Sequence, residues 1–168
     1  MTASNDREGT WMFDSGEFTR IHFKARGFWG SIGVEGAFRN ARGSVNIGPD
    51  GRTDCVMEID VDSIETGISV RDHHLVGADL LDATTYPTIG FGGTAVHHWE
   101  SGMHVEGTLA IKGTTRGHGL DVASTLDGEA LQASASSVIS LSDYKIQAPL
   151  GMLRPTVAVE LAARLIRV

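Results

Sequence analysis

Apolar and polar residues alternate along most of this chain. A period of two residues places apolar side chains on one face of a strand and polar side chains on the other, so the pattern predicts half-buried β-strands. The cleanest run covers residues 103–112. Comparable or shorter runs cover residues 11–14, 18–26, 36–47, 54–61, 88–97, 116–123, 129–141 and 156–168.

Turn residues separate these runs. Gly48-Pro49-Asp50-Gly51 is a strong turn signal between two of them, and Leu126-Asp127-Gly128 is another. The chain holds 21 glycines but only 4 prolines, which is typical of the tight turns in barrels and sandwiches. Because the last run can close against the first, we expect an all-β fold, an antiparallel barrel of about eight strands. It should form a single domain over residues 10–168, after a disordered tail over residues 1–9.

One stretch departs from the strand pattern and predicts a short helical segment around residues 70–82. Ser69 is followed three residues later by Asp72, as in a capping box at a helix start. Apolar residues then recur near the helical period, and Gly77 interrupts them, so we expect two short turns rather than one long helix. Tyr86-Pro87 then returns the backbone to an extended conformation.

The same stretch carries a long ordered pattern. It reads Ser-Ile-x-Thr-Gly, then Arg-Asp-x-His-Leu, then Asp-Leu-Leu-Asp, then Tyr-Pro-x-Ile-x-Phe. The pattern resembles the signature of the YceI-like family, whose members are described as polyisoprenoid-binding, lipocalin-like proteins. The matching residues are Ser63, Ile64, Thr66, Gly67, Arg71, Asp72, His74, Leu75, Asp79, Leu80, Leu81, Asp82, Tyr86, Pro87, Ile89 and Phe91.

The resemblance implies a lipocalin-like barrel whose interior binds a long-chain isoprenoid or quinone-type lipid, with no catalysis and no cofactor. A shorter match runs from Gly107 to Arg116. The family often places a His ahead of a Val-x-Gly-x-Phe element; Val34, Gly36 and Phe38 fit that element, but no matching His precedes them. A role that rests on that His therefore does not transfer. A homodimer is common in the family, although no residue here argues for one.

Charge and composition narrow the choice of partners and compartment. The net charge of −7 argues against binding to nucleic acid or to an anionic membrane surface. Cys55 is the single cysteine, so an intramolecular disulfide is impossible, which suits a reducing compartment. Residues 1–9 lack the apolar core of a signal peptide, and no apolar run is long enough for an integral membrane segment. We expect a cytoplasmic protein, in contrast to the many YceI-like relatives that carry an export signal.

The residues also bear on two other kinds of site, a metal site and an enzyme active site. The seven histidines show none of the spacings typical of a metal site, and we expect no metal. In the segment Arg71–Asp82, a cluster could serve an enzyme or a metal-dependent protein: Arg71, Asp72, His74, Asp79 and Asp82. The same residue types also suit a polar network that fixes a helical flap on a barrel, since a buried arginine must be paired. The second interpretation is favoured, and we expect no enzyme.

The predicted ligand-binding residues are therefore mainly apolar. Those expected on the inner faces of strands are Ile21, Phe23, Met57, Ile59, Phe91, Met103, Val105 and Leu109. Those expected to cap or line the entry are Phe28, Trp29, Leu75, Leu80 and Leu81. Arg71 or His22 would meet a charged or quinone head group. The alternative is a structural or stress-related protein in which the same side chains simply pack as a filled core; the residues leave both open, and the resemblance favours a ligand.

Overall fold

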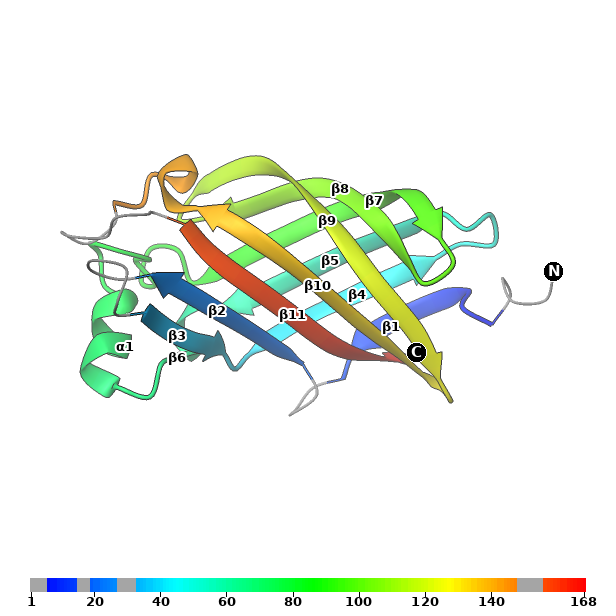
Figure 1. Ribbon diagram of the computed structural model, residues 1–168, viewed down its shortest axis with the longest axis horizontal. Coiled ribbons are helices and arrows are strands. Elements are labelled where there is room, and N and C mark those ends of the chain that lie inside the picture. Colours follow the sequence, from blue (N-terminus) through cyan, green and yellow to red (C-terminus); the bar gives the residue numbers. More distant parts are fainter. Residues whose placement is uncertain (1–5, 15–18, 27–32, 148–155) are drawn as a thin grey trace.

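Most of the described chain is β-strand. Figure 1 shows the computed structural model, which describes residues 6–14, 19–26, 33–147 and 156–168. The strands are β1 (Gly9–Phe13), β2 (Arg20–Arg26), β3 (Gly33–Phe38), β4 (Ala41–Ile47), β5 (Thr53–Asp60), β6 (Ile64–Glu65), β7 (Thr88–Trp99), β8 (Gly102–Ile111), β9 (Thr114–Asp127), β10 (Ala130–Ser140) and β11 (Thr156–Arg167). The helices are α1 (Ser69–Leu75) and two 3-10 turns, η1 (Val61–Ser63) and η2 (Leu141–Tyr144).

The strands form one sheet that closes on itself. Its order is β1-β4-β5-β7-β8-β9-β10-β11, and β11 pairs back to β1. β11 also pairs β2, β2 pairs β3, and β3 pairs β6, all antiparallel. β1 and β2 lie end to end along β11, so together they fill one strand position of the barrel. In the same way β3 and β4 fill the next position, and β5 and β6 fill the one after it. The predicted fold class, a closed antiparallel barrel of eight strand positions with one short α-helix, is confirmed.

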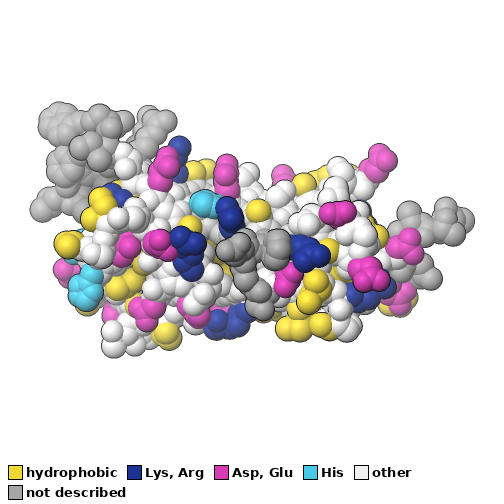
Figure 2. All heavy atoms as spheres, turned by 90° about the horizontal axis from the view of Figure 1, so that it is seen from below, with side chains coloured by type: hydrophobic (Ala, Val, Ile, Leu, Met, Phe, Trp, Pro, Cys, Tyr) yellow, Lys and Arg dark blue, Asp and Glu magenta, His cyan; other side chains and the backbone are white. Residues whose placement is uncertain are grey.

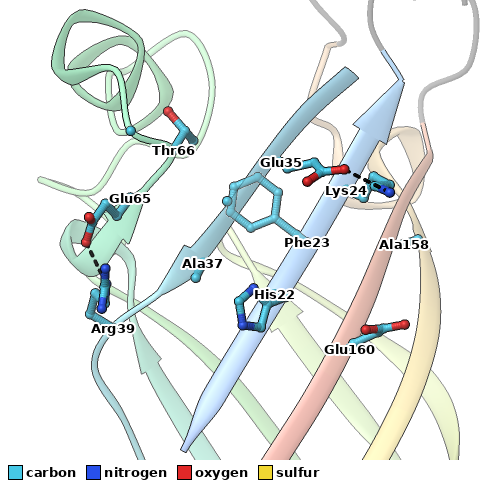
Figure 3. Close-up of a pocket in the computed structure, with 12 residues that line it drawn as sticks. His22, Phe23, Lys24, Glu35, Ala37, Arg39, Glu65, Thr66, Ala158 and Glu160 are labelled. Carbon is cyan, nitrogen blue, oxygen red and sulfur yellow. Dashed lines mark hydrogen bonds and ion pairs between the residues drawn. The ribbon is translucent and has the colours of Figure 1, made fainter. Parts of the chain in front are cut away.

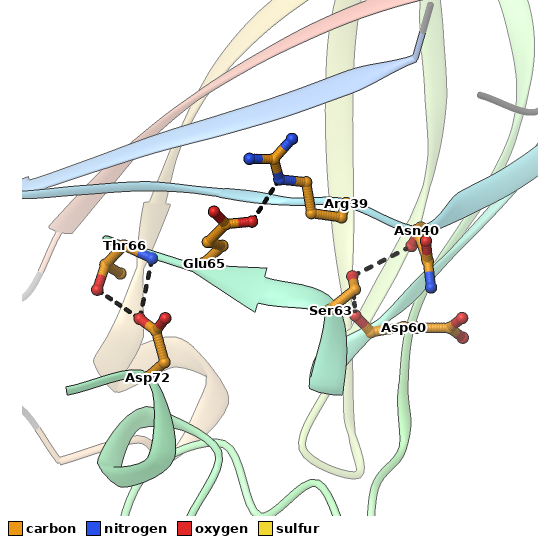
Figure 4. Close-up of polar contacts among 7 residues, drawn as sticks. All are labelled: Arg39, Asn40, Asp60, Ser63, Glu65, Thr66 and Asp72. Carbon is orange, nitrogen blue, oxygen red and sulfur yellow. Dashed lines mark hydrogen bonds and ion pairs between the residues drawn. The ribbon is translucent and has the colours of Figure 1, made fainter. Parts of the chain in front are cut away.

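Backbone contacts join the places where these composite strands are interrupted. The Arg39 N–H donates to the Ser63 carbonyl oxygen at 3.0 Å, and the Asp60 N–H donates to the Asn40 carbonyl oxygen at 3.0 Å. The Ser63 hydroxyl donates to the Asp60 carbonyl oxygen at 2.6 Å (Figure 4). The interruptions of β3/β4 and β5/β6 therefore lie side by side, and these backbone groups stay paired across them.

The helical stretch is shorter than predicted and begins differently. Helix α1 ends at Leu75, and hydrogen-bonded turns carry the chain on, with the Asp82 N–H donating to the Gly77 carbonyl oxygen at 2.9 Å. The predicted capping box at Ser69 is wrong, because Ile68 is the N-cap residue and no side chain caps the helix there. Asp72 instead accepts a hydrogen bond from the Thr66 N–H at 2.9 Å.

The stretch predicted as a disordered tail, residues 1–9, falls partly within the described chain. β1 begins at Gly9, and Arg7 donates from Nη1 to the Ser124 hydroxyl oxygen at 3.1 Å. Residues 1–5 lie outside the described chain. The tie between Arg7 and β9 thus precedes the first strand of the barrel.

The two ends of the barrel are packed differently. At the end where the C-terminus lies (Figure 1), Trp11 and Leu165 are 1% and 0% exposed and pack with Leu131 and Ala163. At the other end, beneath α1 and η2, a larger apolar cluster includes Ile59, Phe91 and Leu109. That second cluster surrounds the cavity described next.

Candidate ligand-binding cavity

An apolar cavity of about 250 Å³ lies inside the half of the barrel nearest α1. Nine of the residues predicted to bind a ligand line it: Ile21, Phe23, Met57, Ile59, Leu75, Leu80, Leu81, Phe91 and Leu109. Within the described chain its lining contains no Lys, Arg, Asp or Glu. Strands supply most of these side chains, because every second residue of a barrel strand points inward. The turns after α1 add Leu80 and Leu81 as a cap.

The other predicted ligand-binding residues either lie away from the cavity lining or are not among the described residues. Val105 is 2% exposed and is packed in the core, where its Cγ1 fills space that a side chain at Gly93 would need, and Met103 packs against the same core. Neither lines the cavity. Phe28 and Trp29 lie outside the described residues.

Arg71 also lies away from the cavity lining. Its Nε donates to the Thr66 hydroxyl oxygen at 2.9 Å, and its Nη2 donates to the Thr66 carbonyl oxygen at 2.9 Å. The Thr66 hydroxyl in turn donates to Asp72 (Figure 4 shows Thr66 and Asp72). Residues on α1 are thus bonded to the turn that follows β6, which is the network expected to hold the helix on the barrel.

The residues of the Arg71–Asp82 segment are not assembled into one site. Arg71 and Asp72 meet at Thr66, whereas His74 and Asp79 are exposed to solvent. No hydrogen bond or ion pair within the described chain joins His74 or Asp79 to that network. Among the described residues, no group of three histidine, cysteine or acidic side chains is placed to hold a metal ion.

The cavity contains a polar pair that the sequence reasoning did not select. His118 on β9 lines it, and its Nε2 lies 2.6 Å from the hydroxyl oxygen of Ser137 on β10. The sequence carries a signal for His118, since it alternates with Leu120 and Val122 on the apolar face of the predicted strand. The sequence carries no such signal for Ser137, which the strand pairing places opposite Val159.

The wall is incomplete on the side of β3. β6 pairs only Ala37 and Phe38, so among the described residues the rest of β3 has no strand partner on that edge. Phe23 lies at this opening, with its ring centroid 5.6 Å from that of Phe38. A Cβ at Gly36 would lie 2.6 Å from the Phe23 ring, so the absence of a side chain at Gly36 leaves room for that ring.

A groove of about 600 Å³ lies outside this opening (Figure 3). Phe23 lines both the groove and the internal cavity. Two ion pairs line the groove: Lys24 Nζ lies 2.8 Å from Glu35 Oε1, and Arg39 Nε lies 2.5 Å from Glu65 Oε2. A charged ligand would have to compete with these ion pairs for its partners.

The outer surface is mixed in charge. Figure 2 shows basic and acidic side chains interspersed along one face, with small apolar patches between them. On the outer face of β8 and β9, His104 Nδ1 lies 2.6 Å from Asp121 Oδ1, and His104 Nε2 lies 2.6 Å from Glu106 Oε1. Hydrogen bonds to Asp121 first, and to Glu106 second, raise the pKa of His104 above its ordinary 6.5. No helix in the described ranges is long and apolar enough to span a membrane.

The family model of the YceI-like domain matches residues 11–165. This chain belongs to the YceI-like family. Among curated proteins, Protein YceI of Shigella flexneri is 30% identical over 104 residues, which are 56% of this chain and 53% of that protein. The match to this relative thus spans about half of its length.

Solved structures show the same YceI-like fold at low identity. BcnA of Burkholderia cenocepacia has a TM-score of 0.78 and 22% identity, with 93% of this chain and 99% of that chain covered. A polyisoprenoid binding domain from Saccharophagus degradans has a TM-score of 0.72 and 20% identity, with 94% and 98% covered. The YCEI protein of Campylobacter jejuni has a TM-score of 0.67 and 21% identity, with 78% and 83% covered.

The structure gives the YceI-like signature a physical role. Of the motif residues, Thr66 is hydrogen-bonded to both Arg71 and Asp72. Tyr86 packs against Gly113, which belongs to the second matching segment. These parts of the signature therefore fix the cap and the adjoining β8–β9 turn around the hollow end.

Proposed function

We propose that this YceI-like protein binds the apolar chain of an isoprenoid-type lipid or quinone in the hollow half of its barrel, and that it catalyses no reaction on that lipid. The observation that carries the proposal is the cavity lining, which in the described chain is apolar apart from His118, Ser136 and Ser137. Each buried CH₂ group of such a chain contributes about 0.8 kcal/mol. The likeness to a fold known as a polyisoprenoid binding domain supports the same ligand class.

The size of the cavity bears on the length of the chain. Its volume of about 250 Å³ is below the lower end, about 300 Å³, of ordinary small-molecule sites. A short amphiphile therefore suits the cavity as it stands. We propose that a long chain is accommodated when Phe23 and Met57, which line the cavity, change rotamer, because Met in particular adapts its shape at little cost.

The direct test is native mass spectrometry of freshly purified protein, followed by solvent extraction and identification of the released molecule. A discrete adduct that extracts as a polyprenyl lipid or quinone would support the proposal. A clean apo mass that stays unchanged after incubation with farnesol would contradict it and favour a filled core.

A blocking variant links the adduct to the cavity. Val159 lines the cavity, and Val159→Phe adds volume where there is free space. We expect it to fold normally and to bind farnesol at least about tenfold more weakly, a loss of roughly 1.4 kcal/mol. Val138→Phe is the matched control, since Val138 is 64% exposed on the neighbouring strand. Equal binding by both variants would place the ligand elsewhere.

Other properties stay predictions. They are a cytoplasmic location, a homodimer, which only the family resemblance suggests, and the lack of nucleic-acid binding. Size-exclusion chromatography with light scattering tests the second of these, and a mass of one chain would contradict it.

A further inference from the structure

The backbone ladder between β9 and β10 stops partway along the two strands. Residues Ala130–Ala135 of β10 pair with Val122–Asp127 of β9. No further residue pairs of the ladder join the two strands beyond Ala135 in the described chain, although β8 pairs β9 as far as Thr114 and β11 pairs β10 as far as Ser140. Figure 1 shows the ribbons of β9 and β10 apart along part of their length. The backbone ladder is therefore missing along a seam between residues 114–121 and residues 136–140, while the ladders on both sides continue.

Side chains cross this seam in place of the backbone ladder. His118 Nε2 and the Ser137 hydroxyl oxygen are 2.6 Å apart, and nearer the strand ends Arg116 Nη2 lies 3.9 Å from Asp143 Oδ1 on η2. The second pair is exposed and weak, as is usual for surface ion pairs. The His118–Ser137 pair is the one that also lines the apolar cavity.

The cavity and the outer surface approach each other at the seam. Ala135, Ser136 and Leu161 line the internal cavity and also a second outer groove, of about 570 Å³. An amphiphile with its chain in the cavity would therefore have its polar group near His118 and Ser137, where the apolar interior meets solvent. Burying that group elsewhere in the cavity would leave it without a partner, at a cost of roughly 1–3 kcal/mol.

His118 has hydrogen-bonding capacity beyond Ser137. Its Nδ1 has no partner among the described residues. A neutral imidazole has one donor and one acceptor nitrogen, and a serine hydroxyl can do both, so the pair can donate to a carbonyl or accept from a hydroxyl. The cavity lining offers no cation in the described chain, and the outer groove sets Asp121 and Glu160 beside Arg20. These surroundings suit an uncharged oxygen better than a diphosphate.

We propose that His118 and Ser137 form the polar recognition point of the ligand site and bind an uncharged hydroxyl or carbonyl oxygen of the amphiphile. This inference rests on the proposed function, since it assigns the polar group of the same ligand. It makes His118 a residue that determines which head group the protein prefers, and leaves binding of the chain to the apolar lining.

The test compares three probes with the same chain: farnesene, which has no oxygen, farnesol and farnesyl diphosphate. Dissociation constants are measured for each by native mass spectrometry titration. We expect farnesol to bind roughly 3- to 10-fold more tightly than farnesene, the range that corresponds to one hydrogen bond. Farnesyl diphosphate should bind no more tightly than farnesol.

Variants then assign the preference. His118→Phe should reduce the farnesol advantage to less than about twofold while farnesene binding is retained, and His118→Gln, which keeps a hydrogen-bonding group, should preserve part of it. Ser137→Val provides the second variant if His118→Phe does not fold. His98→Gln is the matched control, because His98 is exposed on β7 and outside the cavity lining. It should leave all three constants unchanged.

The outcomes separate the two proposals. Equal binding of farnesol and farnesene to the unmodified protein, a preference that survives both His118→Phe and Ser137→Val, or tightest binding of the diphosphate would overturn the role of His118 and leave the apolar site intact. Failure of all three probes to bind would overturn the proposed function itself.

Discussion

The ring of Tyr86 occupies the space that a side chain at position 113 would need. A Cβ at Gly113 would lie 2.6 Å from Tyr86 Cε1, and the backbone there has φ +77°, in the left-handed region. Tyr86 closes the helical stretch and Gly113 forms the turn between β8 and β9. The contact therefore ties the cap to the barrel, and it depends on the absence of a side chain.

Gly113→Ala should lower the free energy of unfolding by about 2–4 kcal/mol, the sum of left-handed strain and overpacking against Tyr86. Thermal or denaturant unfolding measures it. Gly128→Ala is the matched control for strain alone, since Gly128 has φ +63° and nothing lies within 4 Å of its Cβ position. That control should lose only about 1 kcal/mol. Equal losses in both variants would mean that the Tyr86 contact contributes nothing.

Thr66→Val should loosen the cap. The substitution keeps the shape of the side chain but removes the hydroxyl that bonds Arg71 and Asp72, which should cost about 1–3 kcal/mol. Hydrogen exchange should show faster opening of residues 66–83 than of β8 or β9. Thr85→Val, at an exposed position, is the control. Unchanged exchange in the cap would show that the network does not hold it.

His104 should make stability depend on pH in a defined direction. Its folded-state pKa is raised, chiefly by Asp121, so its interactions stabilise the fold fully below the unfolded pKa of about 6.5 and lose that effect as pH rises through the higher folded pKa. The melting temperature of the unmodified protein should exceed that of His104→Gln near pH 6, and the difference should shrink by pH 9. A difference that grows with pH would contradict this assignment, and His98→Gln should show neither trend.

Shortening a buried side chain to alanine should lower the free energy of unfolding by different amounts at the two ends of the barrel. Leu165→Ala removes a side chain that is packed on all sides, so the loss should lie near the upper end of the usual 2–5 kcal/mol. Leu109→Ala acts on a residue that faces existing free space, and should lose about 1–2 kcal/mol less. Urea unfolding of both variants checks the order. The reverse order would mean that the hollow end is as tightly packed as the other.

Local patterns predicted much of the fold. The alternation around Val105 and Leu109 predicted strand β8 nearly to its ends, and the apolar spacing after Ser69 placed the helical stretch in the correct segment. The interruptions at Arg39–Asn40 and at η1 were not predicted, because they depend on how neighbouring strands bend together rather than on the residues themselves.

The residues of the cavity also divide into those that the local pattern predicted and those that it could not predict. Residues such as Ile59 and Phe91 could be chosen from alternation alone, since the inner face of a barrel strand is set by local period. Ser137 could not, because its bond to His118 spans 19 residues and depends on where two strands separate. Arg71 was expected at a head group, but its position was decided by Thr66, whose carbonyl and hydroxyl both face it.

The packing of Trp11 and Leu165 makes the barrel a blind pouch rather than a channel. A chain bound in it could not pass through from one end to the other, so it would leave by the way it came. An amphiphile would enter tail first and depart head first, and the groups at the hollow end would be its first and last contacts. The rate of exchange would then be governed by the cap and the wall around that end, while the sealed end sets the stability of the whole fold.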